Sequence, residues 1–162
     1  MRHILASMVL VVLLFPALAL GEEVKIEDLV EREGLYYPKF SEVPFTGKVT
    51  GRIQGPFKDG KSDGPWVWYY ENGQLNQKGT YKDGKNDGPW FFYFGNGKLS
   101  WKGTFKDDEL DGPWVSYWDN GQLQRKGTYK DGKMDGPWVG YNKDGTVSEE
   151  GTGTFKNGEK VK

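Results

Sequence analysis

The chain has 162 residues with 22 lysine and arginine side chains, 23 aspartate and glutamate side chains, no cysteine and one histidine. A net charge of −1 gives no electrostatic reason to bind nucleic acid or an anionic membrane surface. Because the histidine is His3 and cysteine is absent, the rest of the chain lacks Ser–His and Cys–His catalytic pairs and imidazole or thiolate metal sites.

Residues 1–21 are expected to form a cleaved signal peptide. Arg2 and His3 precede an apolar run over residues 4–15, and small residues follow up to Gly21. This order of basic, apolar and small residues is typical of a secretory signal. An uncleaved membrane anchor is the alternative, but the apolar run is short for a helix that spans a bilayer. The leader therefore predicts a periplasmic or secreted protein.

Residues 22–50 are expected to form an N-terminal capping hairpin and a lead-in. Two short apolar segments, residues 29–30 and 35–37, lie on either side of Glu33 and Gly34, which is the order of two strands around a turn. We expect this hairpin to close the N-terminal edge of a sheet. A short helix over residues 27–32 is the alternative.

The remainder, residues 51–162, is organised by a 24-residue repeat. A stretch that begins DGPW occurs three times in succession, and a fourth copy begins in the same way and then degrades. The copies occupy residues 63–86, 87–110, 111–134 and 135–160. A fixed period of this length is typical of stacked repeats, in which each unit buries its apolar side chains against its neighbours.

Each copy has the pattern of two short strands joined by tight turns. In the first copy, Pro65 stands where a strand can begin, and Asn72 and Gly73 follow the aromatic run. Asn-Gly tolerates the positive φ angles of a two-residue type I′ turn, so we expect the chain to reverse there. The sequence therefore predicts an all-β protein, an elongated single antiparallel sheet of stacked β-hairpin repeats.

The alternation of side chains along each strand assigns two faces to this sheet. With a two-residue turn, Trp68 lies opposite Gln77 and Trp66 opposite Gly79, whereas a three-residue turn would shift the pairing by one. The predicted aromatic face of the first copy carries Trp66, Trp68, Tyr70, Leu75 and Tyr81.

The pattern D-G-P-W-x-x-Y-x-x-N-G-x-L-x-x-K-G-T-[YF] resembles the MORN repeat variant. The resemblance covers residues 63 to about 160, and many bacterial proteins built from this repeat carry the label YwqK-type antitoxin. It implies hairpins laid side by side in a long, curved sheet, and roles in protein scaffolding, membrane tethering or toxin neutralisation. The predicted secretion signal argues against an antitoxin that acts on a cytoplasmic toxin.

No catalytic residue, metal site or cofactor is expected. The aspartates recur at matching turn positions, where Asp serves backbone hydrogen bonding, which argues against a carboxylate pair for glycoside hydrolysis. The segment from Asp83 onward superficially matches a calcium-binding loop, but Lys85 and Phe94 stand where oxygen ligands are required. Aromatic residues interleaved with lysines resemble a platform for single-stranded nucleic acid, yet the acidic residues of each turn cancel the lysine charge.

The aromatic residues that vary between copies are the candidate binding surface. Residues constant in every copy, such as Trp66, are expected to be packing elements. Trp101, by contrast, stands where other copies have Gln77 and Arg125, and it should lie across from Phe92. The alternative is that all these side chains thicken the core of a one-layer sheet. The candidate patch comprises Trp68, Tyr70, Phe92, Phe94, Trp101 and Trp118.

Two functions remain open at this stage. The first is a non-enzymatic, extracytoplasmic scaffold for protein–protein interaction, for example an immunity protein that neutralises an incoming toxin. The second is a carbohydrate- or cell-wall-binding module whose exposed aromatics stack on sugars. The aromatic cluster lies in the middle copies and fades towards Ser116, Gly140 and Asn142. We therefore expect an unidentified protein partner or a glycan, but neither nucleic acid nor a membrane surface.

Overall fold

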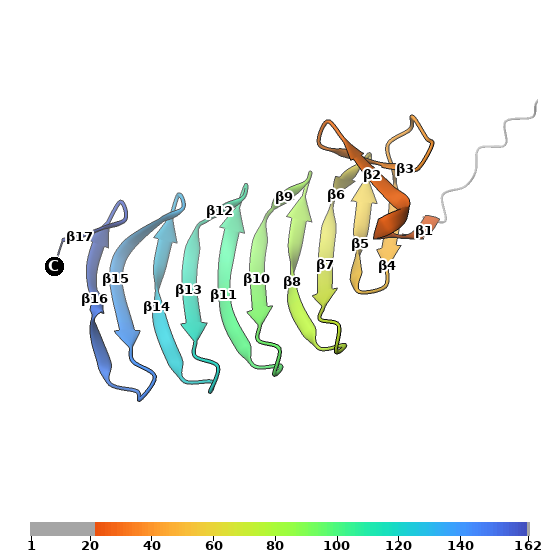
Figure 1. Ribbon diagram of the computed structural model, residues 1–162. Helices are drawn as coiled ribbons and strands as arrows, with labels where there is room; N and C mark the ends of the chain where they lie inside the picture. Colours follow the sequence, from red (N-terminus) through yellow and green to blue (C-terminus); the bar gives the residue numbers. More distant parts are fainter. Residues whose placement is uncertain (1–21, 162) are drawn as a thin grey trace, which may run out of the picture.

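The computed structural model describes residues 22–161, so the predicted signal peptide lies outside the described residues. Its secondary structure is β-strand apart from one 3₁₀ turn (Figure 1). The N-terminal elements are β1 (Glu22–Lys25), the turn η1 (Ile26–Asp28), β2 (Leu29–Arg32), β3 (Leu35–Pro38), β4 (Gly47–Thr50), β5 (Ile53–Lys58) and β6 (Lys61–Ser62). The repeat strands are β7 (Gly64–Tyr69), β8 (Leu75–Lys82), β9 (Lys85–Asn86), β10 (Gly88–Tyr93), β11 (Leu99–Lys106), β12 (Glu109–Leu110), β13 (Gly112–Tyr117), β14 (Leu123–Lys130), β15 (Lys133–Tyr141), β16 (Val147–Lys156) and β17 (Glu159–Lys160).

Nearly all strands belong to one sheet in which neighbours in sequence are neighbours in space. Its order is β1-β4-β5-β7-β8-β10-β11-β13-β14-β15-β16-β17, and the two-residue strands β6, β9 and β12 pair with β5, β8 and β11. Every pair is antiparallel except β1 with β4, which is parallel. The predicted all-β, elongated antiparallel sheet of stacked hairpins is confirmed, with this one parallel pair added.

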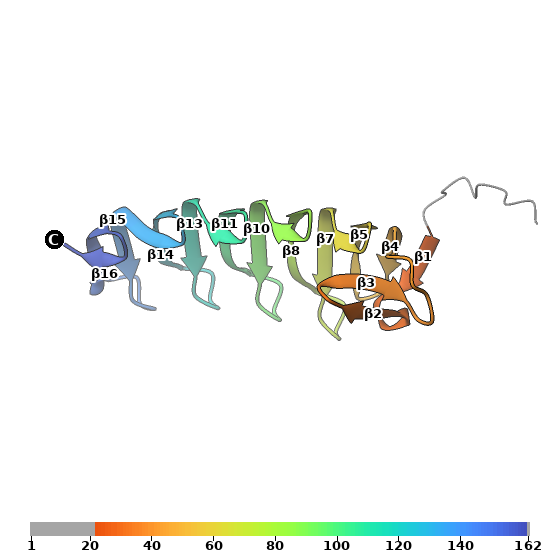
Figure 2. The same cartoon turned by 90° about the horizontal axis from the view of Figure 1, so that it is seen from above.

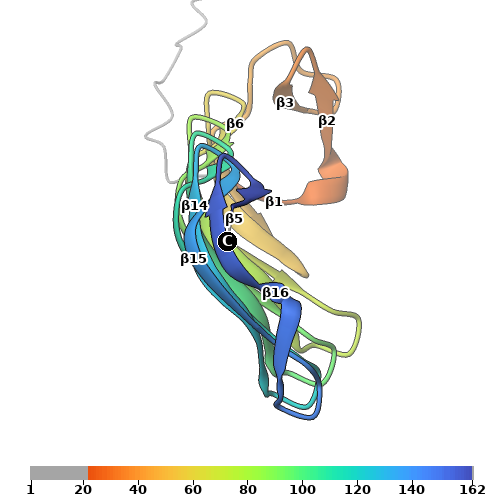
Figure 3. The same cartoon turned by 90° about the vertical axis from the view of Figure 1, so that its left-hand side faces the viewer.

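The sheet is bowed along its strands, so that it has a concave and a convex face (Figure 3). The β2–β3 hairpin forms around Glu33 and Gly34 as predicted, and both residues have positive φ angles of 53° and 77°. It does not close the sheet edge, however, because β1 occupies that edge. Instead it lies over the concave face at the N-terminal end (Figures 2 and 3), where Leu29 packs in one cluster with Phe57 and Trp66. The alternative helix over residues 27–32 is reduced to η1.

The Asn-Gly turns contain three residues rather than two. In the first repeat the Tyr70 N–H donates to the Gln74 carbonyl at 2.8 Å, and the Gly73 N–H donates to the Tyr70 carbonyl at 3.0 Å. Gly73 has φ +80°, whereas Asn72 is not among the residues with positive φ. The predicted type I′ turn is therefore wrong at this position, because the loop is a type I turn closed by a left-handed glycine.

Two adjacent residues with positive φ occur at the other turn of each unit. Asp83 and Gly84 have φ angles of 51° and 86° and connect Lys82 to Lys85, which are paired across the ladder. Both positive angles are what a type I′ turn requires. The type I′ turn, whose twist matches the right-handed twist of the strands, therefore connects β8 to β9 and does not occur at Asn-Gly.

A β-bulge restores the predicted pairing beyond the longer loop. Tyr69 lies opposite Leu75, but Trp68 lies opposite Gln77, so one extra residue is absorbed between them. The pairs of Trp68 with Gln77 and of Trp66 with Gly79 are consequently those the sequence predicts. The prediction that Leu75 shares a face with Trp68 is wrong. Leu75 lies directly opposite Tyr69 and therefore shares its face, and Tyr69 points away from the face of Trp68.

The concave face is built on tryptophans that each lie over a glycine of the preceding strand. Trp90 is only 3% exposed, and its indole N–H donates to the Thr80 carbonyl at 3.3 Å. A Cβ atom at Gly79 would overlap the indole ring, so only glycine leaves room for it. The same arrangement is found for Trp66 over Gly55 with the Pro56 carbonyl, and for Trp138 over Gly127 with the Thr128 carbonyl.

These tryptophans are linked by other aromatic rings into a ladder that crosses the repeats. The Trp90 ring contacts Tyr81 edge-on at 5.2 Å and Trp68 at 5.6 Å between centroids. It also stacks with Phe92 at 6.0 Å. Aromatic pairs of this kind add about 0.5–1.5 kcal/mol each beyond the area that they bury. Each unit is therefore stabilised mainly by its neighbours.

The asparagine of each Asn-Gly turn also joins one repeat to the next. Asn96 Oδ1 accepts the Lys98 N–H at 3.0 Å within its own loop, while Asn96 Nδ2 donates to the Asp119 carbonyl of the following loop at 3.1 Å. Asn72 and Asn120 make equivalent bonds to the loops that follow them. The fourth copy has Asp144, which keeps the bond within its loop.

Substitution of the tryptophan-supporting glycine should be strongly destabilising. We expect Gly79→Ala to lower the free energy of unfolding by about 3 kcal/mol, because the new methyl group overlaps a fully packed indole. Gly103→Ala is the matched control, since the nearest indole atom, Cδ1 of Trp114, would lie 2.8 Å away and belongs to a less buried ring. Its expected loss is about 1 kcal/mol. Urea unfolding of both variants measures the loss in the free energy of unfolding. Equal losses would contradict the role given to Gly79 as the residue on which Trp90 packs.

Exchange of the turn asparagine should depend on its place in the array. We expect Asn96→Asp to lower the free energy of unfolding by about 1 kcal/mol, because the amide donor to the next loop is lost. Asp144→Asn should have a smaller effect than Asn96→Asp, because the amide oxygen can still accept the bonds from the Thr146 N–H and hydroxyl and only the negative charge of the acceptor is lost. Thermal and urea unfolding compare the two, and a neutral Asn96→Asp would show that the bond between loops contributes nothing.

Candidate functional site

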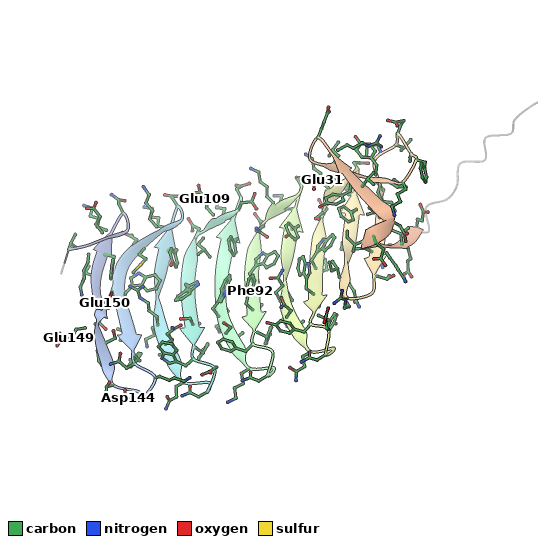
Figure 4. All side chains as sticks on the ribbon, viewed as in Figure 1. Glu31, Phe92, Glu109, Asp144, Glu149 and Glu150 are labelled. Carbon is green, nitrogen blue, oxygen red and sulfur yellow. The ribbon has the colours of Figure 1, made fainter. Side chains whose placement is uncertain are left out.

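The concave face is the surface on which the candidate aromatic residues gather. Among residues 22–161, the β2–β3 hairpin covers this face at its N-terminal end (Figures 1 and 3). Beyond it the aromatic ladder continues uncovered across the middle of the sheet, where Phe92 lies (Figure 4). A contiguous surface of half-buried aromatic side chains is typical of an interaction site.

The third repeat interrupts the ladder at Ser116. This serine takes the position held by Trp68 in the first repeat and Phe92 in the second, and it is 4% exposed. Its hydroxyl donates to Gln124 Oε1 at 3.0 Å. Because the side chain is short, the space that an aromatic ring fills in the earlier repeats is left to neighbouring side chains, which bury the serine.

Trp114 responds to this gap by taking a different position from the other repeat tryptophans. Its ring contacts Trp138 at 5.6 Å, a contact that Trp68 makes with Trp90 in the first repeat. Within residues 22–161 its indole N–H has no carbonyl acceptor comparable to that of Trp90, and its ring is only half-buried. The third repeat therefore presents a partly exposed indole where the first two present a buried one.

Two adjoining hollows flank Ser116 on the concave face, with volumes of about 440 and 710 Å³. Four residues line both of them: Trp114, Ser116, Trp118 and Gln124. The smaller hollow also reaches Phe94 and Trp101, and the larger one reaches Arg125. We call this pair the Ser116 hollow.

Arg125 is one of three cationic residues that line the Ser116 hollow, together with Lys143 and Lys160. Its guanidinium carbon lies 4.9 Å from the Trp138 ring centroid and 5.5 Å from that of Phe155. Its Nε atom is buried and has no hydrogen-bond partner. Packing against two rings takes part of the guanidinium out of water, and no carboxylate of residues 22–161 lies within 4.0 Å of it, which raises the electrostatic gain available from an anion.

The smaller hollow is lined in part by an ion pair between Asp119 and Lys143. Lys143 Nζ lies 2.7 Å from Asp119 Oδ1, and hydrogen bonding by this lysine holds the pKa of Asp119 below its usual value of 3.8. Both side chains are more than half exposed, so the pair contributes little to stability. As a consequence, the Asp119 carboxylate stays ionised and its negative charge is balanced by the Lys143 ammonium beside the hollow.

The six candidate residues occupy two parts of the concave face. Trp68, Phe92 and Trp101 belong to the ladder, and Trp101 stacks on Phe92 with centroids 4.0 Å apart, across from it as predicted. Tyr70, Phe94 and Trp118 precede the Asn-Gly loops. The Tyr70 hydroxyl and the Trp118 indole N–H donate to backbone carbonyls of the next repeat, which gives both a structural role as well.

Sequence reasoning did not identify Ser116, Gln124 or Arg125 as part of the candidate site. The signal for Ser116 was present, because a small residue replaces an aromatic one at a fixed repeat position. Arg125 was also distinctive, since it is the cation at a position held by Gln77 and Trp101 in the other copies. Gln124 could not be identified, because its direction depends on the β-bulge.

The convex face carries a second feature that sequence reasoning did not single out. An open apolar groove of about 650 Å³ runs across the repeats there, with a lysine column along it. The Lys78 ammonium lies 5.2 Å from the ring centroid of Phe91 on this face. The groove is lined by Pro89, Pro113, Pro137, Phe91, Val115, Val139, Lys102, Lys126, Thr104 and Thr128, together with Gly103, Gly127 and Trp114.

No cluster of three or more metal-ligating side chains occurs within residues 22–161. No helix in the described part of the chain is both long and apolar enough to cross a membrane.

Comparison with known proteins identifies the repeat. Residues 62–83, 86–107 and 110–131 match the family described as MORN repeat variant. MORN repeats are in general protein- or membrane-binding repeat modules. No curated protein matched the sequence. Among solved structures, a chain of the "Crystal structure of GtfA/B complex bound to UDP and GlcNAc" is 13% identical with a TM-score of 0.22. The alignment covers 82% of this chain and 28% of that one, and so weak a likeness carries no argument.

The titration of Asp119 tests the ion pair at the rim. A folded-state pKa below the usual value means that the pair contributes above that value and is lost as the pH falls through the lowered pKa. We expect carboxyl NMR to find Asp119 titrating below 3.8, and Lys143→Gln to raise its pKa. Asp144 is the internal control, because hydrogen bonds from Thr146 lower its pKa independently of Lys143. An unchanged Asp119 pKa in Lys143→Gln would contradict this pairing.

Proposed function

We propose that this chain, which carries three consecutive MORN-variant repeats, is a non-enzymatic, extracytoplasmic scaffold that binds a protein partner through its concave face. The observation that supports this most directly is the uncovered part of the aromatic ladder. Phe92 and Trp101 are half-buried there, whereas Trp68 packs against the N-terminal cluster to which Leu29 of the β2–β3 hairpin belongs.

The β2–β3 hairpin supports the proposal because it illustrates what the concave face can hold. A four-residue strand pair packs its Leu29 and Tyr36 side chains against Phe57 and Trp66. The tilted ring contact of Tyr36 with Phe57 is 4.9 Å between centroids. A segment of a partner protein could bury apolar side chains against Trp68 to Trp101 in the same manner, with aromatic anchors supplying most of the affinity.

The extracytoplasmic location rests on the sequence of residues 1–21, with its basic start, apolar run and small residues. An incoming toxin is one class of partner that such a location would allow, and neutralising it requires only binding. A non-enzymatic role is supported by the chemistry of the concave face, where the carboxylates that line the hollows are Glu150 and an Asp119 that is paired with Lys143.

Carbohydrate binding is the second candidate, and one observation favours it. Trp101, Trp114 and Trp118 are gathered around a hollow that also holds Ser116 and Gln124. Aromatic faces beside planar amides are the side chains that sugar-binding sites commonly use. Ser116 and Gln124 are bonded to each other, however, which leaves fewer polar groups for sugar hydroxyls.

Site-specific photo-crosslinking in the producing cell tests the choice of partner and face. A photo-reactive phenylalanine analogue at Phe92 should form a covalent adduct with a protein, whereas the same analogue at Val115 on the convex face should not. Trp101→Gln, which installs the residue of the first repeat, should reduce the Phe92 adduct because it removes the stacked ring.

Equal adducts from both faces, or none from Phe92, would overturn the proposed function. Binding of the purified chain to a glycan array without any protein adduct would support the carbohydrate alternative instead. Cell fractionation with an antibody to the chain checks its location, and retention in the cytoplasm would contradict the extracytoplasmic part.

A further inference from the structure

Arg125 differs from the other arginines in residues 22–161 because it has no carboxylate partner. Arg32 lies 3.0 Å from Glu42 Oε1, and Arg52 lies 3.3 Å from Glu71 Oε1. No acidic oxygen of the described residues lies within 4.0 Å of Arg125. Its Nε atom is buried and has no hydrogen-bond partner, as is also true of Arg32, so the missing carboxylate is what distinguishes Arg125.

An unpaired guanidinium in this position favours an anionic ligand. Trp138 and Phe155 replace water around Arg125 on one side, at 4.9 and 5.5 Å. The rest of its surroundings is the larger part of the Ser116 hollow, about 710 Å³, which is open to solvent. Arginine binds carboxylates with two parallel hydrogen bonds, and partial desolvation strengthens such a pair.

The tryptophans beside Arg125 indicate which chemical group of the ligand should lie next to its anion. Trp114 is displaced from its glycine and half-buried, and Trp118 is held by its bond to the Tyr141 carbonyl at 3.1 Å. Both rings line the same hollow as Arg125. Their exposed surface is apolar, so a ligand gains by placing an apolar group next to its carboxylate.

We propose that the Ser116 hollow binds an acidic side chain of a partner protein, with its carboxylate on Arg125 and an adjacent apolar side chain against Trp114 and Trp118. This inference rests on the proposed function and names the partner's chemistry: an Asp or Glu next to an aliphatic or aromatic residue. The Ser116 hollow is then the place where the partner protein is anchored to the concave face.

A carboxylate fits this hollow better than a phosphate or a sugar. Glu150 lies on the rim of the same hollow, at the C-terminal end of the sheet (Figure 4), and repels a dianion more than a monoanion. Lys160, also on the rim, already donates to the Glu149 carbonyl at 2.8 Å. Sugar hydroxyls would require several polar partners, whereas Ser116 is bonded to Gln124.

Selection of peptides from a random heptapeptide display library on the purified full chain tests this inference. We expect the selected peptides to be enriched in Asp or Glu beside an apolar residue. A synthetic copy of the most enriched peptide, measured by isothermal titration calorimetry, should bind Arg125→Gln about tenfold or more weakly, as loss of a charge-assisted bond predicts. Lys102→Gln on the convex face is the matched control and should bind as the unchanged chain does.

Two further variants distinguish the hollow from general charge effects. Glu150→Gln removes the competing carboxylate and should tighten binding of the acidic peptide by a few-fold. Ser116→Trp restores the residue type of the first repeat, should fill the hollow and should abolish binding while the far-ultraviolet circular dichroism of the sheet is retained. A variant that does not fold is excluded from the comparison by that spectrum, and Arg125→Gln and Glu150→Gln then decide.

The outcomes separate this inference from the proposed function. Selected peptides without acidic enrichment, or with equal affinity for Arg125→Gln, would overturn the inference, while an adduct at Phe92 would still support the scaffold. Failure to select any peptide would overturn the inference as well, and absence of the adduct would overturn both. Binding of oligogalacturonate to Arg125 without binding of acidic peptides would identify the carboxylate source as a sugar and would also overturn the proposal.

Discussion

The seating of an indole on a glycine of the preceding strand is the interaction on which the structure depends. A sheet of one layer has no second layer to bury its apolar face, so burial must come from within the face. At Trp90 this is achieved by laying the ring flat across Gly79, with its N–H bonded to the adjacent carbonyl of Thr80. The tryptophan of one repeat can thus be buried only because the strand before it carries a glycine, which has no side chain, at the facing position.

This dependence explains why the sequence repeats with so little variation at some positions. Trp66, Trp90 and Trp138 can be buried only if Gly55, Gly79 and Gly127 precede them in space. The turns follow the same logic, since Asn96 bonds to the loop of the next unit. Stability of this kind is shared between neighbours and is lost at the ends, where β1 and the short strand β17 form the edges.

The same regularity makes the third repeat informative. Ser116 removes one ring from the ladder, Trp114 moves towards the gap, and Arg125 packs on Trp138. Each of these changes lowers burial or leaves a polar atom without a partner, as Arg125 Nε is. Natural sequences depart from local consistency mainly where function requires it. The hollow is therefore a more specific candidate than the aromatic patch as a whole, because packing alone does not explain it.

The sequence by itself determined the repeat period, the two-strand unit and the pairing of Trp68 with Gln77, because turn residues and strand alternation act locally. It also identified Trp101 and Phe92 as partners. Only the tertiary structure decided that Leu75 faces away from Trp68, since a three-residue loop and a compensating bulge have opposite effects on register. It likewise decided that the β2–β3 hairpin covers the concave face and that Ser116 opens a hollow beside Arg125. These features depend on contacts between residues far apart in the chain, which no local pattern encodes.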